Sequence, residues 1–219
     1  MSSRQHTVNK VLKLLEEHYG EEMNSHVGVG DPFRTLVGCV LSHRTRDENA
    51  SQAARALFEV AGSPDDVLRL RPEELKRRIR CSRFYNRKAK RILSICRALK
   101  KDFGGEVPED RDMLLSLPGV GPKTADIVLS YAFDRPAIAV DVHIATLAKR
   151  LGLVDEKAKP EDVKEALEGL VPPEKYRFID RALVRLGKEY CRSRNPRCPM
   201  CFMSNLCEEN SKKGSNNPF

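Results

Sequence analysis

The stretch Leu117-Pro118-Gly119-Val120-Gly121-Pro122-Lys123 decides how this chain folds. An apolar helix end runs into two glycines one residue apart, and the proline suits the first position of a second helix. Glycine tolerates positive φ, so the turn can be tight and can leave backbone N–H groups at a helix N-terminus, where a phosphate oxygen binds well. Lys123 falls in the first turn of the second helix, at the positive end of its dipole. The stretch therefore predicts a helical hairpin that can hold a phosphate.

A second polar group follows eighteen residues after Lys123, in the segment Ala139-Val140-Asp141-Val142-His143. Asp141 has a bland interpretation as the N-cap of a helix over 142–150, a common use of aspartate. Likewise, a G-x-G turn is usually only a turn, and a lysine on a helix is usually solvated. Because all three features occur together with a cysteine cluster, we favour chemistry on a nucleic-acid backbone.

Composition narrows the class of protein. The chain has 219 residues, 40% hydrophobic content and a net charge of +8. This is enough apolar surface for one large or two small domains, and the positive charge favours nucleic acid as the partner. No apolar run approaches the ~20 residues of a membrane span, and the N-terminus has no apolar signal region. We therefore expect an intracellular protein without a membrane partner.

Four of the seven cysteines lie within seventeen residues in the pattern C-x6-C-x2-C-x5-C, namely Cys191, Cys198, Cys201 and Cys207. Four thiolates held this close together need a cation, so the pattern predicts a metal centre, either zinc or an iron–sulfur cluster. Arg194 is one of several cations in the same segment, which can also contact a phosphate backbone. Cys39, Cys81 and Cys96 lie in apolar helical patterns and are expected to pack as small hydrophobes.

The rest of the chain reads as helices, with no alternating β pattern of useful length. Proline followed by acidic residues marks helix starts at 64, 72 and 160, and Asp31-Pro32 opens a helix whose residues 36–41 carry no charge. Asp47 and Asn86 are expected as N-caps, and Gly104-Gly105 ends the helix that begins near 87. Residues 212–219 are polar and are expected to be disordered.

A basic segment surrounds Phe84-Tyr85. It contains Arg77, Arg78, Arg80, Arg83, Arg87, Lys88, Lys90 and Arg91. A run of charge is usually a solvated face, and Phe84 could be a core residue at the start of the next helix. An exposed aromatic at a basic tip could instead wedge between bases and hold a nucleotide out of the stack.

Taken together, these motifs resemble the endonuclease III family of helix-hairpin-helix DNA glycosylases. The resemblance rests on Leu117–Ala125, on Val140-Asp141-x-His143, on the cysteine spacing, and on the shorter stretches 85–89 and 106–110. It implies an all-α fold with a six-helix barrel domain over 28–135. It also implies a helical domain built from 1–27 and 136–211 that holds a [4Fe–4S] cluster, with the active site in the cleft between the two.

Carried onto this chain, the resemblance makes Lys123 the nucleophile and Asp141 its carboxylate partner. It implies a bifunctional glycosylase that removes oxidised or saturated pyrimidines and cleaves abasic sites by β-elimination. The expected partner is double-stranded DNA with a damaged base or an abasic site, bound by a monomer. The expected location is the cytoplasm of a prokaryote, or the nucleus if the source is a eukaryote. The residues expected at DNA are Gly119, Val120, Gly121, Lys123, Arg44, Phe84, Arg83, His143 and Arg194.

Two positions depart from the family pattern. Phe84 occupies the place of a wedge residue that is usually aliphatic, and an aromatic keeps that role. Arg44 replaces a glutamine that fills the gap left by a flipped base, and it brings charge and different donors. The preference for the opposite base is therefore left open.

Two rival functions remain at this point. A monofunctional relative would remove mismatched thymine, uracil or adenine, but such relatives lack the lysine found at 123. A non-catalytic iron–sulfur protein that only binds DNA would suit the cysteines and the basic face, although it needs no pairing of Lys123 with Asp141. Zinc in place of iron is a third, weaker alternative.

Overall fold

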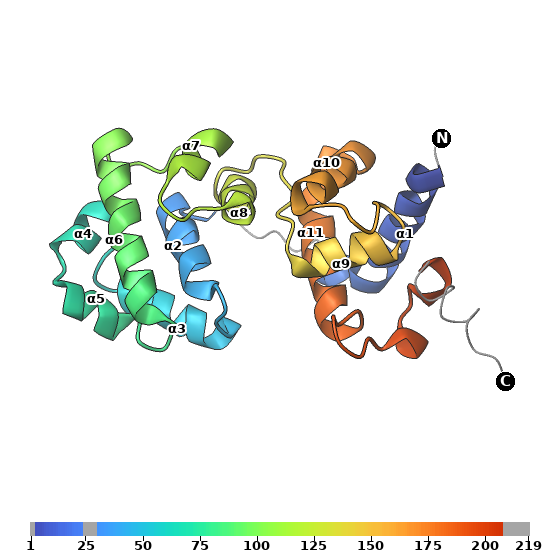
Figure 1. Cartoon of the computed structure of the whole chain (residues 1–219), viewed down its shortest axis with the longest axis horizontal. Helices are drawn as coiled ribbons and strands as arrows, with labels where there is room; N and C mark the ends of the chain where they lie inside the picture. The colour runs from blue at the N-terminus through green and yellow to red at the C-terminus, as the bar shows by residue number, and fades with distance from the viewer. Residues whose placement is uncertain (1–2, 24–29, 208–219) are drawn as a thin grey trace. The chain divides into compact units, whose positions relative to one another are not determined.

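The computed structural model describes residues 3–23 and 30–207, and this part of the chain is built from helices and turns without a β-strand. The expected disorder of residues 212–219 falls outside the described residues. The chain divides into two compact units, residues 28–135 and residues 1–27 with 136–219 (Figure 1). No described helix is long and apolar enough to cross a membrane. The expectation of an all-α fold is confirmed.

The unit formed by residues 28–135 is organised around α2, the helix without charged residues in its second half. Leu36, Val37 and Leu41 are fully buried there, as expected, and α2 contacts α3, α6 and α8 (Figure 1). The helices of this unit are α2 (Pro32–Ser42), α3 (Asp47–Phe58), α4 (Pro64–Arg69), α5 (Pro72–Arg78), α6 (Tyr85–Asp102), α7 (Arg111–Ser116) and α8 (Pro122–Ala132).

The other unit joins the N-terminal helix to the C-terminal third of the chain. Helix α11 is its centre, contacting both α1 and α9, and a buried apolar cluster runs from Val8 to Met203. Its helices are α1 (Ser3–Met23), α9 (Val142–Arg150), α10 (Pro160–Leu170) and α11 (Tyr176–Glu189), with the 3-10 turns η1 (Pro173–Lys175), η2 (Cys198–Met200) and η3 (Ser204–Leu206).

Helix starts follow the local chemistry at most positions. Proline is the first residue of α4, α5 and α10, each with acidic residues in the first turn. The Asp31 carboxylate accepts a 2.7 Å hydrogen bond from the Arg34 backbone N–H at the start of α2. Two expected caps are wrong: Asp47 and Asn86 both lie inside their helices, after Arg46 and Phe84. Phe84 is left-handed at φ 60°, a start that no local sequence signal marks.

Candidate nucleic-acid site and cysteine cluster

The turn between α7 and α8 is the hairpin that the sequence predicts. Leu117 and Val120 are buried and joined by a 3.1 Å backbone hydrogen bond, which fixes the turn to the core. Between them Gly119 is exposed and left-handed at φ 75°, and Gly121 is the N-cap of α8. The turn thus presents backbone at the positive end of a helix dipole, which suits a phosphate.

Arg91 lies directly against this turn, a contact that the sequence did not predict. A Cβ atom added at Gly119 would lie 2.6 Å from Arg91 Nε. A side chain at position 119 would therefore displace Arg91 from its place beside the hairpin. The exposed Arg91 guanidinium adds a positive charge to a turn already suited to anions.

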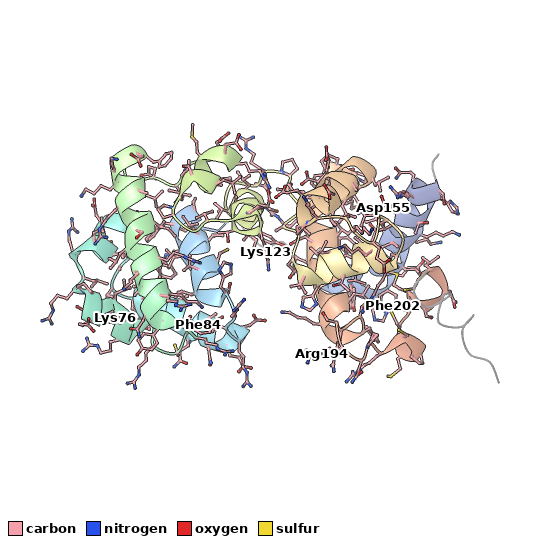
Figure 2. All side chains as sticks on the ribbon, in the orientation of Figure 1. Lys76, Phe84, Lys123, Asp155, Arg194 and Phe202 are labelled. Carbon is pink, nitrogen blue, oxygen red and sulfur yellow. The ribbon has the colours of Figure 1, made fainter. Side chains whose placement is uncertain are left out.

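Lys123 is the second residue of α8 and is exposed to solvent (Figure 2). The positive charge of Lys123 affects the pKa values of two side chains at the C-terminal end of α2. Burial lowers the pKa of His43, and Arg91, Lys123 and Lys88 lower it further. Burial also raises the pKa of the Cys39 thiol to about 12, with Lys123 opposing the rise. Lys123 therefore belongs to a strongly positive region of the unit 28–135.

Asp141 belongs to the other unit, where it is the N-cap of α9. Its Oδ1 accepts hydrogen bonds from the backbone N–H groups of His143 at 2.8 Å and Ile144 at 3.0 Å. The segment before it is held by the Asp180 carboxylate, which accepts from the Ala139 N–H at 3.1 Å. The expected capping role is confirmed, and it leaves the catalytic role a prediction.

Two further predicted residues share the unit of Asp141. The His143 side chain packs against Gly187, where an added Cβ would come within 2.6 Å of it. Arg194 is exposed in the cysteine segment (Figure 2). Gly119, Val120, Gly121, Lys123, Arg44, Phe84 and Arg83 all lie in the unit 28–135.

A basic cavity of about 330 Å³ opens on the unit 28–135. Arg44 and Phe84 both line it, both are exposed, and both are left-handed, at φ 50° and 60°. The Arg83 guanidinium lies 4.9 Å from the centre of the Phe84 ring. With Phe84 43% exposed, the alternative of a core phenylalanine is wrong (Figure 2). The other lining residues are His43, Arg87, Lys88 and Arg91.

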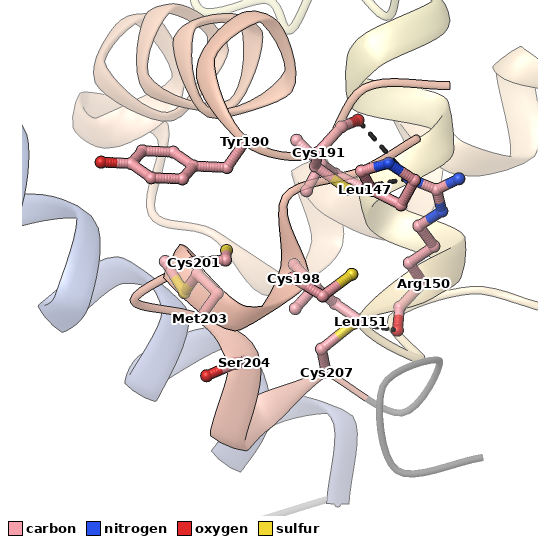
Figure 3. A pocket seen from close by; sticks show the side chains of 11 residues that line it. Leu147, Arg150, Leu151, Tyr190, Cys191, Cys198, Cys201, Met203, Ser204 and Cys207 are labelled. Carbon is pink, nitrogen blue, oxygen red and sulfur yellow. Dashed lines mark hydrogen bonds between the residues drawn. The ribbon is translucent and has the colours of Figure 1, made fainter. Parts of the chain in front are cut away.

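The four clustered cysteines line one small cavity after α11 (Figure 3). None of the four is in a disulfide, and the Arg150 guanidinium donates to Cys191 Sγ at 3.1 Å. The thiol of Cys207 approaches the Arg150 carbonyl oxygen at 3.4 Å. Across residues 3–23 and 30–207, no three His, Cys, Asp or Glu side chains form a ready group for a single metal ion.

The three remaining cysteines differ from one another. Cys39 and Cys96 are buried, as expected, and burial raises the pKa of Cys96 to about 12. Cys81 is only half-buried, and its thiol lies 3.5 Å from the Asn49 carbonyl oxygen. The expectation of a core residue is wrong for Cys81, because it falls in the short turn after α5 rather than on the inner face of a helix.

Comparison with known proteins agrees with these features. Residues 37–173 match the HhH-GPD superfamily of base excision DNA repair proteins. The chain is 44% identical over 184 residues to endonuclease III of Thermotoga maritima, covering 84% of this chain and 86% of the relative.

Two solved structures resemble the fold over nearly its whole length. A non-covalent endonuclease III–DNA complex matches with a TM-score of 0.87 and 33% identity, over 99% of this chain and all of the other. A trapped endonuclease III–DNA covalent intermediate matches with a TM-score of 0.84 and 34% identity, over 98% of this chain and all of the other. The chain therefore belongs to the endonuclease III family of helix-hairpin-helix base excision repair enzymes.

Proposed function

We propose that this DNA glycosylase and abasic-site lyase removes oxidised or saturated pyrimidines from double-stranded DNA and cleaves the strand through an imine at Lys123. The observation that carries the proposal is the place of Lys123. It is an exposed amine in the first turn of α8, directly after a glycine hairpin that is suited to a phosphate. An amine that lies beside a bound backbone phosphate is close enough to attack the sugar attached to that phosphate.

The proposed reaction uses the amine in two ways. The Lys123 nitrogen attacks the sugar C1′ and the base departs with the C1′–N bond electrons. The sugar then opens to an imine between C1′ and the lysine nitrogen. The imine withdraws electrons and acidifies the C2′ proton, so removal of that proton expels the 3′ oxygen and breaks the strand. A water nucleophile could release the base but could not form the imine.

Asp141 is proposed as the carboxylate that accepts the Lys123 proton and stabilises positive charge on the sugar. Its backbone cap hydrogen bonds fix the carboxylate at the start of α9. A group held by two N–H donors needs no reorganisation when charge develops nearby, which is the usual source of electrostatic catalysis.

We also propose that Cys191, Cys198, Cys201 and Cys207 hold the [4Fe–4S] cluster that the family resemblance implies. The donor set fits, because four cysteine side chains outside any disulfide line one cavity and the Arg150 guanidinium donates a hydrogen bond to one of them. When bound, the cluster would cross-link the C-terminal segment and hold it folded. Cys198→Ser should lower the iron and sulfide content per chain and bleach the visible absorption, whereas Cys81→Ser should change neither. Stoichiometric zinc without iron would contradict the assignment.

The decisive experiment is borohydride trapping on a duplex with one abasic site, because borohydride reduces an imine to a stable covalent link. We expect an adduct from the native protein, none from Lys123→Gln, and an unchanged yield from Lys101→Gln, which alters another exposed lysine. An adduct that persists in a well-folded Lys123→Gln variant would overturn the role of Lys123. No adduct from folded, DNA-binding native protein would favour a monofunctional glycosylase or a non-catalytic DNA-binding protein.

A further inference from the structure

Lys88 is a buried lysine whose hydrogen bonds all go to neutral oxygens. It lies on α6 with 6% exposure. Its ammonium donates to the backbone oxygens of Leu41 at 2.6 Å and His43 at 2.7 Å, and to the hydroxyls of Thr45 and Ser82, each at 2.8 Å. Burial, and then the nearby Arg91 guanidinium, lowers the pKa of Lys88 to about 8. Burying an ammonium is costly, so this arrangement calls for an explanation other than core packing.

One set of these hydrogen bonds fixes the loop that carries Arg44. The carbonyl groups at the end of α2 lack partners within the helix, and Lys88 binds two of them. It also binds the hydroxyl of Thr45, so it holds the residues on both sides of Arg44. Arg44 is left-handed at φ 50°, a conformation that is strained for a residue with a side chain. The loop would relax if these contacts were lost.

The same lysine fixes the turn that carries Phe84. Ser82 is fully buried, and its hydroxyl binds Lys88 Nζ while also donating to the Leu41 carbonyl at 2.9 Å. The Thr45 hydroxyl accepts from the Arg83 backbone N–H at 3.1 Å, which links the two loops directly. Lys88 thus contacts the surroundings of both strained residues that line the basic cavity.

We propose that Lys88 is a positioning residue that holds Arg44 and Phe84 in the fixed arrangement needed to open a damaged duplex. The inference rests on the proposed function. Separating two stacked base pairs costs free energy, and an inserted side chain can hold them apart only if its own backbone stays in place. A buried ammonium bound to four oxygens of two loops supplies that stiffness. It also links the two loops, so that displacing one loop would require the other to move as well.

The test compares an abasic site in a duplex with the same site in a single strand. The single strand has no partner base to displace, so it needs the chemistry of Lys123 but not the two loops. We expect Lys88→Met to lower the duplex cleavage rate by about tenfold or more while the single-strand rate stays within about twofold. Lys101→Met, an exposed change on the same helix, should leave both rates unchanged. Equal losses on both substrates, or no loss on either, would overturn the proposal.

A failure of the proposed function would be distinguishable from a failure of this inference. If the native protein forms no imine, the same comparison can be made by affinity, using a tetrahydrofuran abasic analogue in duplex and in single-stranded DNA. Lys88→Met should then weaken only the duplex complex. Equal weakening of both complexes, or none, would overturn the role of Lys88 independently of the chemistry.

A second measurement covers the case in which Lys88→Met folds poorly. Glycine adopts φ 50° without strain, so Arg44→Gly removes the strain from that loop. We expect Lys88→Met to lower the melting temperature more in the Arg44→Gly background than in the native one, because in the native protein the loss of the restraint also releases the strain at Arg44 and so offsets part of the loss. Equal losses in both backgrounds would show that Lys88 does not restrain Arg44, and would overturn the proposal.

Discussion

Gly119 is the residue on which the hairpin depends. Its φ is 75°, and a Cβ atom added to it would lie only 2.6 Å from Arg91 Nε. We expect Gly119→Ala to lower the free energy of unfolding of DNA-free protein by about 1–2 kcal/mol from the backbone conformation alone. Displacement of Arg91 would add to this loss.

Gly121 is the matched control for that measurement. Its φ is −109° and no atom lies within 4 Å of its added Cβ, so Gly121→Ala should change the free energy of unfolding little. Urea unfolding of both variants without DNA checks the comparison. Equal losses from the two substitutions would mean that the left-handed conformation of Gly119 is not what the turn requires.

The lowered pKa of Lys88 predicts a pH dependence of stability. In the folded protein its pKa is about 8, against an ordinary value of 10.5 in the unfolded chain. Between these values the unfolded state binds more protons, so this residue makes the free energy of unfolding rise with pH from about 8 to 10.5. Denaturation at several pH values should show a steeper rise for the native protein than for Lys88→Met. Parallel curves would contradict the prediction.

Individual residues differ in how far the sequence reveals their roles. The roles of Lys123 and the four cysteines can be predicted from the spacing of their motifs, because the chemistry requires a particular residue type at a particular position. The roles of Lys88 and Arg91 cannot, since they lie in a run of eight basic residues in which most side chains are solvated. Which member of that run is buried, and which rests on Gly119, depends on how α6 packs against α2 and the hairpin.

At the scale of helices, local signals predict most starts, miss the cap of α3 by one residue, and fail at the start of α6. Proline and acidic residues mark α4, α5 and α10 because they satisfy the needs of a first turn in any context. The start of α6 is different, because Phe84 is held left-handed by contacts from a loop about forty residues earlier. Such a start has no local cause, so it cannot be predicted from local sequence.

Helix α9 allows the capping role of Asp141 to be separated from the proposed catalytic one. Asparagine caps a helix about as well as aspartate, whereas alanine costs about 1 kcal/mol. We expect Asp141→Asn to keep the native melting temperature and Asp141→Ala to lower it, while both lose most of the glycosylase rate. Thermal unfolding and single-turnover base release check the two parts. A fully active Asp141→Asn variant would limit Asp141 to capping.

At the scale of the whole molecule, a chain with a net charge of +8 should bind DNA in a way that depends on salt, with a slope set by the number of phosphates it contacts. Each phosphate neutralised by the protein adds roughly −0.9 to the slope of log affinity against log salt. Arg83 in one unit and Arg194 in the other are both exposed and both predicted at DNA. If each contacts one phosphate, Arg83→Gln and Arg194→Gln should each make the slope shallower by about one, and the double variant by about two. Lys101→Gln should leave it unchanged. A single variant that weakens binding without altering the slope would show that its arginine does not contact a phosphate. A double variant whose slope is no shallower than that of either single variant would show that the two arginines do not contact separate phosphates.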